Sequence, residues 1–140
     1  MVTGALALCF ASALAGSGLY LNFVEQPARL ALDDAALLAE WAPSDRRGLA
    51  LMAALALLAM IAGLLAFKES GDLRHLGGAL LALSTWPYSL FALAPLNNQI
   101  LSLAPRDIGA ARALVRQWGM LEYAQTALAV VSTALFLGAI

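Results

Sequence analysis

Apolar residues dominate the chain in four long stretches, and this pattern predicts its main elements. Three stretches contain no Asp, Glu, Lys, Arg or His, and the fourth is interrupted only by Glu122; they cover residues 1–24, 48–67, 76–105 and 119–140. About 20 apolar residues in a helix cross the hydrocarbon layer of a bilayer. We therefore expect four membrane-spanning helices, approximately over residues 2–24, 48–67, 76–96 and 118–139.

The stretch nearest the N-terminus could also be interpreted as a secretion signal. Small residues at 11–18 follow an apolar segment, as they do near a cleavage site. However, no Lys or Arg precedes this segment, and the apolar pattern continues through Leu19, Leu21 and Phe23. We interpret it as a retained first helix.

The overall composition agrees with a membrane protein. The chain has 140 residues, of which 62% are hydrophobic and 12% charged, and its mean hydropathy is +0.81. Four spans leave no room for a separate soluble domain. We predict an all-α, integral membrane four-helix bundle that forms a single domain over residues 1–140, with the lipid bilayer as its main partner. The net charge of −1 gives no reason to expect nucleic-acid binding, which needs a concentrated basic surface.

The first long connection, residues 25–47, is predicted to contain a short interfacial helix. Asp33 or Asp34 can cap a helix over residues 35–41. Pro43 lies just beyond this segment and is expected to end it.

The connection between the third and fourth spans is also predicted to be partly helical. Asp107 can cap a helix that begins near Ile108 and runs through Trp118 directly into the fourth span. Trp41 and Trp118 would then lie at the level of the lipid headgroups, where indole is stable. Each Trp therefore has two interpretations, an interfacial anchor or a ligand contact.

Charge in the connections predicts the orientation of the bundle. Four spans place both termini on one side and the two longer connections on the other. Residues 25–47 and 97–117 carry six Arg, whereas the short turn over residues 68–75 carries one Lys and one Arg. Positive residues favour the cytoplasmic side. We expect a multi-pass protein of an inner or plasma membrane with its longer connections in the cytoplasm.

A short pattern occurs twice in the chain. The pattern Tyr-x-x-Phe-x-x-x-Pro starts at Tyr20 and again at Tyr88, 68 residues later. Both copies end an odd-numbered span and lead into a longer connection. Three identities can arise by chance. The alternative is two helix hairpins related by an axis along the membrane normal, as in transporters with parallel repeats.

The predicted topology brings several polar residues to one membrane face. On each helix they are three or four residues apart and so share a side. The candidate residues are Asn22, Glu25 and Arg29 on the first span, Asn97 after the third, and Trp118, Glu122 and Gln125 on the fourth.

These residues permit proton-transfer chemistry, and each also has a structural interpretation. A carboxylate partly removed from water can act as a base nearer neutral pH. Alternatively, Arg29 pairs with Glu25 one turn back, and Asn97 only turns the chain after a proline. An ionisable residue inside a span, such as Glu122, usually faces a partner or a cavity. His75 is in the short turn on the opposite face. We find no His or Cys set for a metal and no phosphate loop, so we expect no metal and no cofactor.

Several motifs resemble those of the anthrone oxygenase-like family, whose members are small four-helix membrane proteins largely catalogued as a domain of unknown function. The motifs are the segment at residues 22–29, the Trp41-Ala-Pro-Ser segment, the segment at residues 94–100, and Trp118 at the start of the last span. The resemblance covers nearly the whole chain, and the order and spacing of these short motifs carry it.

The resemblance implies oxidation of anthrones to anthraquinones by molecular oxygen, without an evident metal or flavin. By position it implicates Glu25, Pro27, Arg29, Pro95, Asn97 and Trp118. The family commonly has a His four residues after this Trp and an Arg three residues later. This chain has Glu122 and Gln125 at those positions.

Two functions follow as hypotheses. The first is a cofactor-independent oxidoreductase acting on a lipophilic phenolic or quinone-like molecule. In it, Glu122 is the base, Arg29 stabilises the oxyanion, Asn97 orients the substrate and Trp118 stacks on it, with Glu25 completing the catalytic group and Asn22 and Gln125 the binding group. The alternative is a non-catalytic membrane protein that binds a lipid or quinone, or an accessory subunit. A transporter would need a homo-oligomer to enclose a path.

Overall fold

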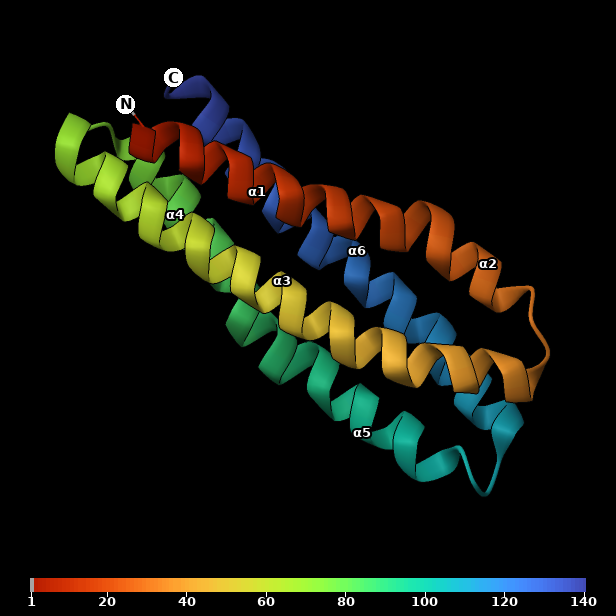
Figure 1. The fold of residues 1–140 in the computed structure, drawn as a ribbon. Helices are drawn as coiled ribbons and strands as arrows, with labels where there is room; N and C mark the ends of the chain where they lie inside the picture. Colours follow the sequence, from red (N-terminus) through yellow and green to blue (C-terminus); the bar gives the residue numbers. More distant parts are fainter. Residues whose placement is uncertain (1) are drawn as a thin grey trace.

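The computed structural model describes residues 2–140 and confirms an all-α four-helix bundle. Four helical rods follow one another along the chain (Figure 1). The first rod joins α1 (Val2–Tyr20), the π-helical turn η1 (Leu21–Glu25) and α2 (Gln26–Leu30), and the second is α3 (Asp34–Ser70). The third joins α4 (Leu73–Tyr88), the π-helical turn η2 (Ser89–Leu93) and α5 (Ala94–Leu103), and the fourth is α6 (Ile108–Gly138).

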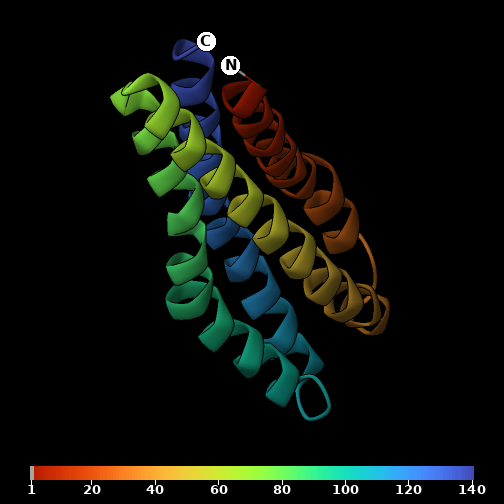
Figure 2. The ribbon, with the colours of Figure 1, turned by 60° about the vertical axis from the view of Figure 1, so that its left-hand side comes forward.

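The rods pack as a ring in which each packs mainly against two neighbours. The helices α1 and α4 each pack against both α3 and α6. The two termini lie together at one end of the bundle, and the loops that follow α2 and α5 lie at the other end (Figures 1 and 2). This arrangement matches the topology predicted from the four apolar stretches.

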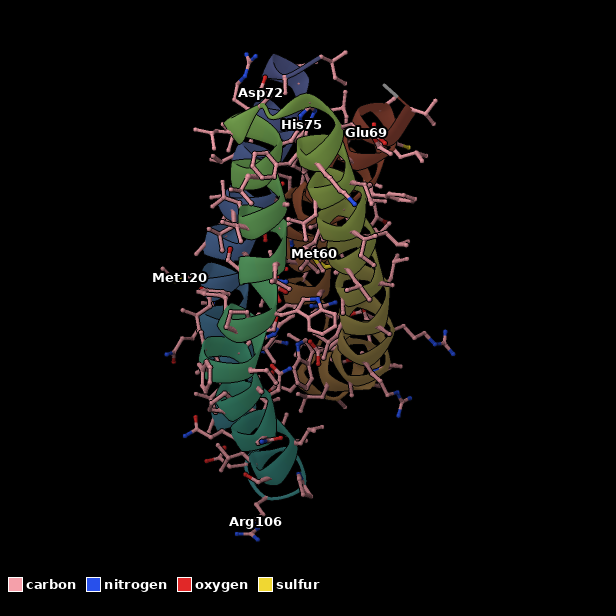
Figure 3. All side chains as sticks on the ribbon, turned by 90° about the vertical axis from the view of Figure 1, so that its left-hand side faces the viewer. Met60, Glu69, Asp72, His75, Arg106 and Met120 are labelled. Atoms are coloured by element: carbon pink, nitrogen blue, oxygen red, sulfur yellow. The ribbon has the colours of Figure 1, made fainter. Side chains whose placement is uncertain are left out.

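Each rod is long and apolar enough to cross a membrane, as the sequence pattern predicted. Large apolar side chains remain exposed on the outside of the bundle, including Phe91 at 81% and Met120 at 69%. Met120 projects away from the ribbon (Figure 3). A lipid environment explains such exposure, because apolar side chains facing hydrocarbon lose nothing by remaining outside the protein core. The cytoplasmic location of the longer connections stays a prediction.

Aspartates cap α3, α4 and α6, as the sequence predicted for two of these helices. The side chain of Asp33 accepts a hydrogen bond from the backbone nitrogen of Ala36, and Asp107 accepts one from Ala110. Asp72 caps α4 in the short turn, where hydrogen bonds from Arg74 lower the pKa of the Asp72 carboxyl to about 2. These caps satisfy backbone donors that have no partner within the helix.

Pro43 was predicted to end a short helix. This prediction is wrong, because α3 runs without a break from Asp34 to Ser70. Contacts on both sides of the proline hold one continuous helix. Arg29 bonds both Glu40, which precedes Pro43, and Ser44, which follows it. The helix after Asp107 is confirmed as an extension of the fourth span, beginning at Ile108. Neither connection therefore contains a separate interfacial helix.

The repeated Tyr-x-x-Phe-x-x-x-Pro pattern coincides with the two π-helical turns. The turn η1 starts directly after Tyr20 and η2 directly after Tyr88, so the turns have the same 68-residue spacing as the sequence pattern. Each turn precedes a proline, Pro27 or Pro95, at the start of the next helical segment. A proline cannot donate to the carbonyl four residues earlier and its ring clashes there, and an extra residue in the turn relieves both problems. The structure thus supports the interpretation of two equivalent hairpins.

The half of the bundle near the termini is packed closely around Phe136. This ring is fully buried and faces Gly63 of α3 and Gly78 of α4. Ser132 donates a hydrogen bond to the Gly78 carbonyl at 2.7 Å. Small residues here let the helices approach, which is the usual way that helices associate in lipid.

We expect Gly63→Ala and Gly78→Ala to destabilise the bundle. The added methyl groups would lie 2.7 Å and 2.8 Å from the Phe136 ring. Overpacking of this kind costs about 1–3 kcal/mol. Thermal unfolding in detergent measures the effect. Gly109→Ala is the matched control, since the nearest atom to its added methyl group is 3.7 Å away. Unchanged midpoints for both core variants would contradict this account of the packing.

Candidate functional site

A cavity of about 430 Å³ lies between the rods in the half of the bundle farther from the termini. All four rods contribute to its wall, with Leu21 from η1, Leu49 from α3, Leu93 from η2 and Trp118 from α6 among the apolar or aromatic lining residues. Its polar lining residues are Ser17, Glu25, Ser44, Asp45, Ser89, Asn97, Glu122 and Gln125. The volume and mixed lining are typical of a small-molecule site.

Three buried polar atoms in the wall of this cavity have no hydrogen-bond partner in the part of the chain that the structure describes. They are Nε1 of Trp118, Oδ1 of Asn97 and Oε2 of Glu122. An unpaired polar group buried away from water is costly, so native proteins rarely leave several together. All three atoms belong to residues that line the cavity.

Glu122 lies on α6 with only 5% of its surface exposed. It is one turn after Trp118 and one turn before Thr126, whose hydroxyl donates to the Glu122 carbonyl at 3.0 Å. Gln125 is beside it in the wall, and its Oε1 accepts a hydrogen bond from the Ser89 hydroxyl at 3.2 Å. The expected shared face of α6 is therefore turned inward.

Asp45 is a cavity residue that the sequence interpretation did not include. It extends from α3, and its Oδ2 accepts a hydrogen bond from Asn97 Nδ2 at 2.9 Å. A signal for it existed in the sequence: Asp45 is four residues after Trp41, just as Glu122 is four residues after Trp118. The predicted break at Pro43 had placed Asp45 outside any helix.

Arg29 is the centre of a buried ionic cluster next to the cavity. Its side chain has no exposed surface and pairs with Glu25 at 2.6 Å and with Glu40. It also donates to Oε1 of Gln26 at 2.9 Å and to Ser44 at 3.2 Å. The cluster ties the end of the first rod to the beginning of α3. Glu40, Gln26 and Ser44 were not predicted, because their contacts depend on how the rods pack.

The structure brings together most of the predicted site residues. Glu25, Asn97, Trp118, Glu122 and Gln125 all line the cavity. Asn22 and Arg29 do not line it. Asn22 is buried and donates to the Thr126 hydroxyl at 2.8 Å, and the donors of Arg29 are taken by the cluster. Both residues therefore lie outside the cavity lining and contact α6, one of the helices that form it.

The interpretation of the two tryptophans as lipid-exposed interfacial anchors is wrong, because both are buried inside the bundle. Trp41 and Trp118 are 1% and 2% exposed, and their rings meet edge to face with centroids 5.9 Å apart. The Arg29 guanidinium lies over the Trp118 ring, 5.3 Å from its centroid. Indole rings also pack well inside proteins, and here the buried Arg29 provides a cationic neighbour.

His75 lies at the end of the bundle near the termini, with Glu69 and Asp72 and far from Arg106 (Figure 3). Its ring is hydrogen-bonded to Ser70 at 3.0 Å. It cannot contribute to the cavity, as predicted. Within residues 2–140, no group of three or more His, Cys, Asp or Glu side chains is placed to hold a metal ion.

A second hollow of about 330 Å³ adjoins the cavity on the side of α4 and η2. The two share the lining residues Leu49, Ser89, Ala94 and Gln125. Exposed Leu90 is at the outer side of the second hollow. The cavity and the second hollow thus share part of their walls, and the second hollow reaches the exposed surface of the bundle.

The fold is a four-helix bundle whose helices are long and apolar enough to cross a membrane, with a cavity of mixed polar and apolar lining between its rods. The family model described as anthrone oxygenase matches residues 41–135, and the chain belongs to this family. No curated protein and no solved structure matches the chain. The family match includes the cavity residues of α3, α5 and α6, whereas Glu25 and Arg29 precede it.

We expect Arg29→Ala to destabilise the bundle strongly, since it leaves Glu25 and Glu40 without their cation. Breaking one side of a buried ion pair costs about 3–5 kcal/mol. The partial exposure of both carboxylates places the expected loss near the lower end, at about 3 kcal/mol. Denaturant unfolding in detergent measures it.

Arg116→Ala is the control, because Arg116 is exposed and outside the cluster. Its effect should remain within about 0.5 kcal/mol. Adding Glu25→Gln and Glu40→Gln to the Arg29 variant should restore part of the lost stability. An Arg29 variant as stable as the Arg116 variant would refute a structural role for the cluster.

Proposed function

We propose that this protein is a membrane-embedded oxygenase that oxidises a lipophilic anthrone or related phenolic molecule with molecular oxygen, without a cofactor. The observation that carries the proposal is that three residues with an unpartnered buried polar atom, Trp118, Asn97 and Glu122, line one cavity. The family membership supplies the type of reaction.

An anthrone suits such a site because its reactive methylene lies between two aromatic rings and opposite a carbonyl group. Loss of one methylene proton gives an anion delocalised onto the carbonyl oxygen, and this anion can transfer an electron to oxygen. The overall change converts CH₂ and O₂ into C=O and H₂O. The chemistry required of the protein is therefore to bind the rings, move protons and stabilise the oxyanion.

Glu122 is the proposed base. Among the described residues, it is the one carboxyl group of the cavity wall that makes no hydrogen bond or ion pair, whereas Glu25 is paired with Arg29 and Asp45 is bonded to Asn97. A base needs a free lone pair within reach of the proton that it removes. The position of Glu122 in the wall satisfies this requirement for a ligand in the cavity.

Neutral donors would stabilise the developing oxyanion. Trp118 presents an indole N–H without a partner, and Gln125 presents an amide whose oxygen is fixed by Ser89. Asn97 would orient the substrate through its unpartnered Oδ1. Arg29, first expected to meet the oxyanion, is better assigned as a positioning residue that holds Trp118 and Glu25.

We expect Glu122→Gln to abolish turnover. The amide keeps the size of the side chain but cannot accept the methylene proton. Loss of a general base lowers rates by about 10²–10⁴-fold. Oxygen consumption and quinone absorbance, measured on purified protein with a panel of anthrones and hydroquinones, report the change.

Glu69→Gln is the matched control, because Glu69 is hydrogen-bonded to Thr3 at the opposite end of the bundle. This variant should retain wild-type activity. If the wild-type protein consumes no oxygen with any compound of the panel, or if the Glu122 variant is fully active, the proposed reaction is refuted.

A lipophilic substrate would enter from the bilayer through the second hollow. We expect Ala94→Trp to raise KM at least about tenfold with a smaller change in kcat, because the indole would fill the wall shared by both hollows and remove ligand contacts. Ala54→Trp on exposed α3 surface is the control. Equal KM values for the two variants would exclude this route.

Ligand binding without turnover is a second candidate function. Within the described residues, the cavity wall has three acidic residues and no Lys, Arg or His, so no cation directly faces a substrate anion. A neutral quinone would accept a hydrogen bond from the Trp118 indole N–H through a carbonyl oxygen, and a hydroxyl-bearing lipid would donate one to Asn97 or Glu122. Quenching of tryptophan fluorescence by a quinone, in a protein that consumes no oxygen, would favour this function.

A further inference from the structure

Two carboxyl groups face the cavity from equivalent places on two helices. Asp45 is one helical turn after Trp41 on α3, and Glu122 is one helical turn after Trp118 on α6. Residues four apart in a helix share a face. Because the two indoles contact each other with centroids 5.9 Å apart, the two acids begin from neighbouring points and line one cavity.

The repeat extends to the rest of the cavity wall. Leu21 and Glu25 of η1 correspond, at a spacing of 68 residues, to Ser89 and Leu93 of η2, and all four line the cavity. Matching positions of the two hairpins therefore bound the site. Asp45 and Glu122 are 77 residues apart, so their correspondence rests on the shared Trp-x-x-x-acid spacing of α3 and α6 and not on the 68-residue spacing.

The two acids differ in their partners. Asn97 holds Oδ2 of Asp45, and Oδ1 of Asp45 makes no hydrogen bond within the described residues. Glu122 has no partner for Oε2. Glu25, the third acid of the wall, is bonded to Arg29 and Ser44. Because Glu25 is paired with the Arg29 cation and Asp45 has no ion pair within the described residues, Asp45 is the second carboxyl group suited to donate a proton.

We propose that Asp45 is a second catalytic residue, which protonates the oxygen that leaves when the O–O bond breaks. The proposal rests on the proposed function. After Glu122 removes the first methylene proton, the substrate anion combines with O₂, and Glu122 returns its proton to give a neutral C–H hydroperoxide.

The second half of the reaction needs a base and an acid together. Glu122 removes the remaining C–H proton, and that electron pair forms the C=O bond. The O–O bond breaks, and hydroxide leaves with a proton from Asp45 as water. The proton held by Glu122 then passes to Asp45, so both groups return to their starting states. Carbon is oxidised, and the oxygen atoms of O₂ are reduced.

Two groups on different helices fit this step because its two protons move at opposite ends of the H–C–O–O unit. Glu122 reaches the cavity from α6, and Asp45 reaches it from α3. The amide of Asn97 fixes one oxygen of Asp45 and leaves the other for the proton. Asn97 thus acts as a positioning residue for Asp45.

The test is the ratio of quinone formed to oxygen consumed by Asp45→Asn in detergent with an anthrone. This variant should still consume oxygen, because Glu122 performs the first step. It should form quinone at least about tenfold more slowly, and a substrate hydroperoxide should accumulate. A peroxide assay and mass spectrometry detect this product, which a purely structural defect would not generate.

Asp33→Asn is the matched control, because Asp33 caps α3 outside the cavity and Asn is an equally good cap. The Asp33→Asn variant should form one quinone molecule for each O₂ molecule that it consumes. If Asp45→Asn fails to fold, the ratio of quinone formed to oxygen consumed is measured for Asn97→Ala instead. That ratio should fall below the wild-type value. An Asp45 variant with the wild-type ratio, or with oxygen consumption and quinone lost in parallel, overturns the role of Asp45. No oxygen consumption by the wild type and Asp33→Asn instead refutes the proposed function itself.

Discussion

The buried guanidinium of Arg29 is the interaction on which the functional half of the bundle depends. It joins Glu25 at the end of the first rod to Glu40 and Ser44 of α3, and it lies over Trp118 of α6. A charge removed from water must be paired and hydrogen-bonded. Three rods are therefore fixed around one side chain, and the cavity forms beside it.

The two ends of the bundle differ for the same reason. Near the termini, glycines and alanines allow close contact around Phe136. Toward the longer connections, prolines at equivalent positions introduce π-helical turns, and large polar side chains project inward. Such turns are frequent at functional sites because they re-aim side chains. Here they supply opposite parts of the cavity wall.

Much of the fold could be predicted from the sequence. The four apolar stretches gave the helices, and Asp33 and Asp107 gave two of their starting points. Pro43 misled the prediction because tertiary contacts on both sides outweigh the local tendency of proline to end a helix. Local pattern cannot report such contacts.

The candidate site was only partly predictable. Spacing along single helices placed Glu122 and Gln125 on the face of the last span that lines the cavity, and topology placed Asn97 on the same side. Spacing could not show that Arg29 has its donors occupied, or that Asp45 and Ser89 complete the wall. Those facts depend on distances between rods. The repeat was visible in six residues, but its meaning required the two turns in the structure.

The central claim is that Glu122 removes a proton from a lipophilic substrate held in the membrane. Exchange of anthrone methylene hydrogens for solvent deuterium without oxygen isolates this step, because the anion can then only recapture a proton. Wild-type protein should accelerate exchange well above the buffer and detergent background, and Glu122→Gln should not. Wild-type exchange no faster than background, with the anthrone shown to bind, would contradict the account.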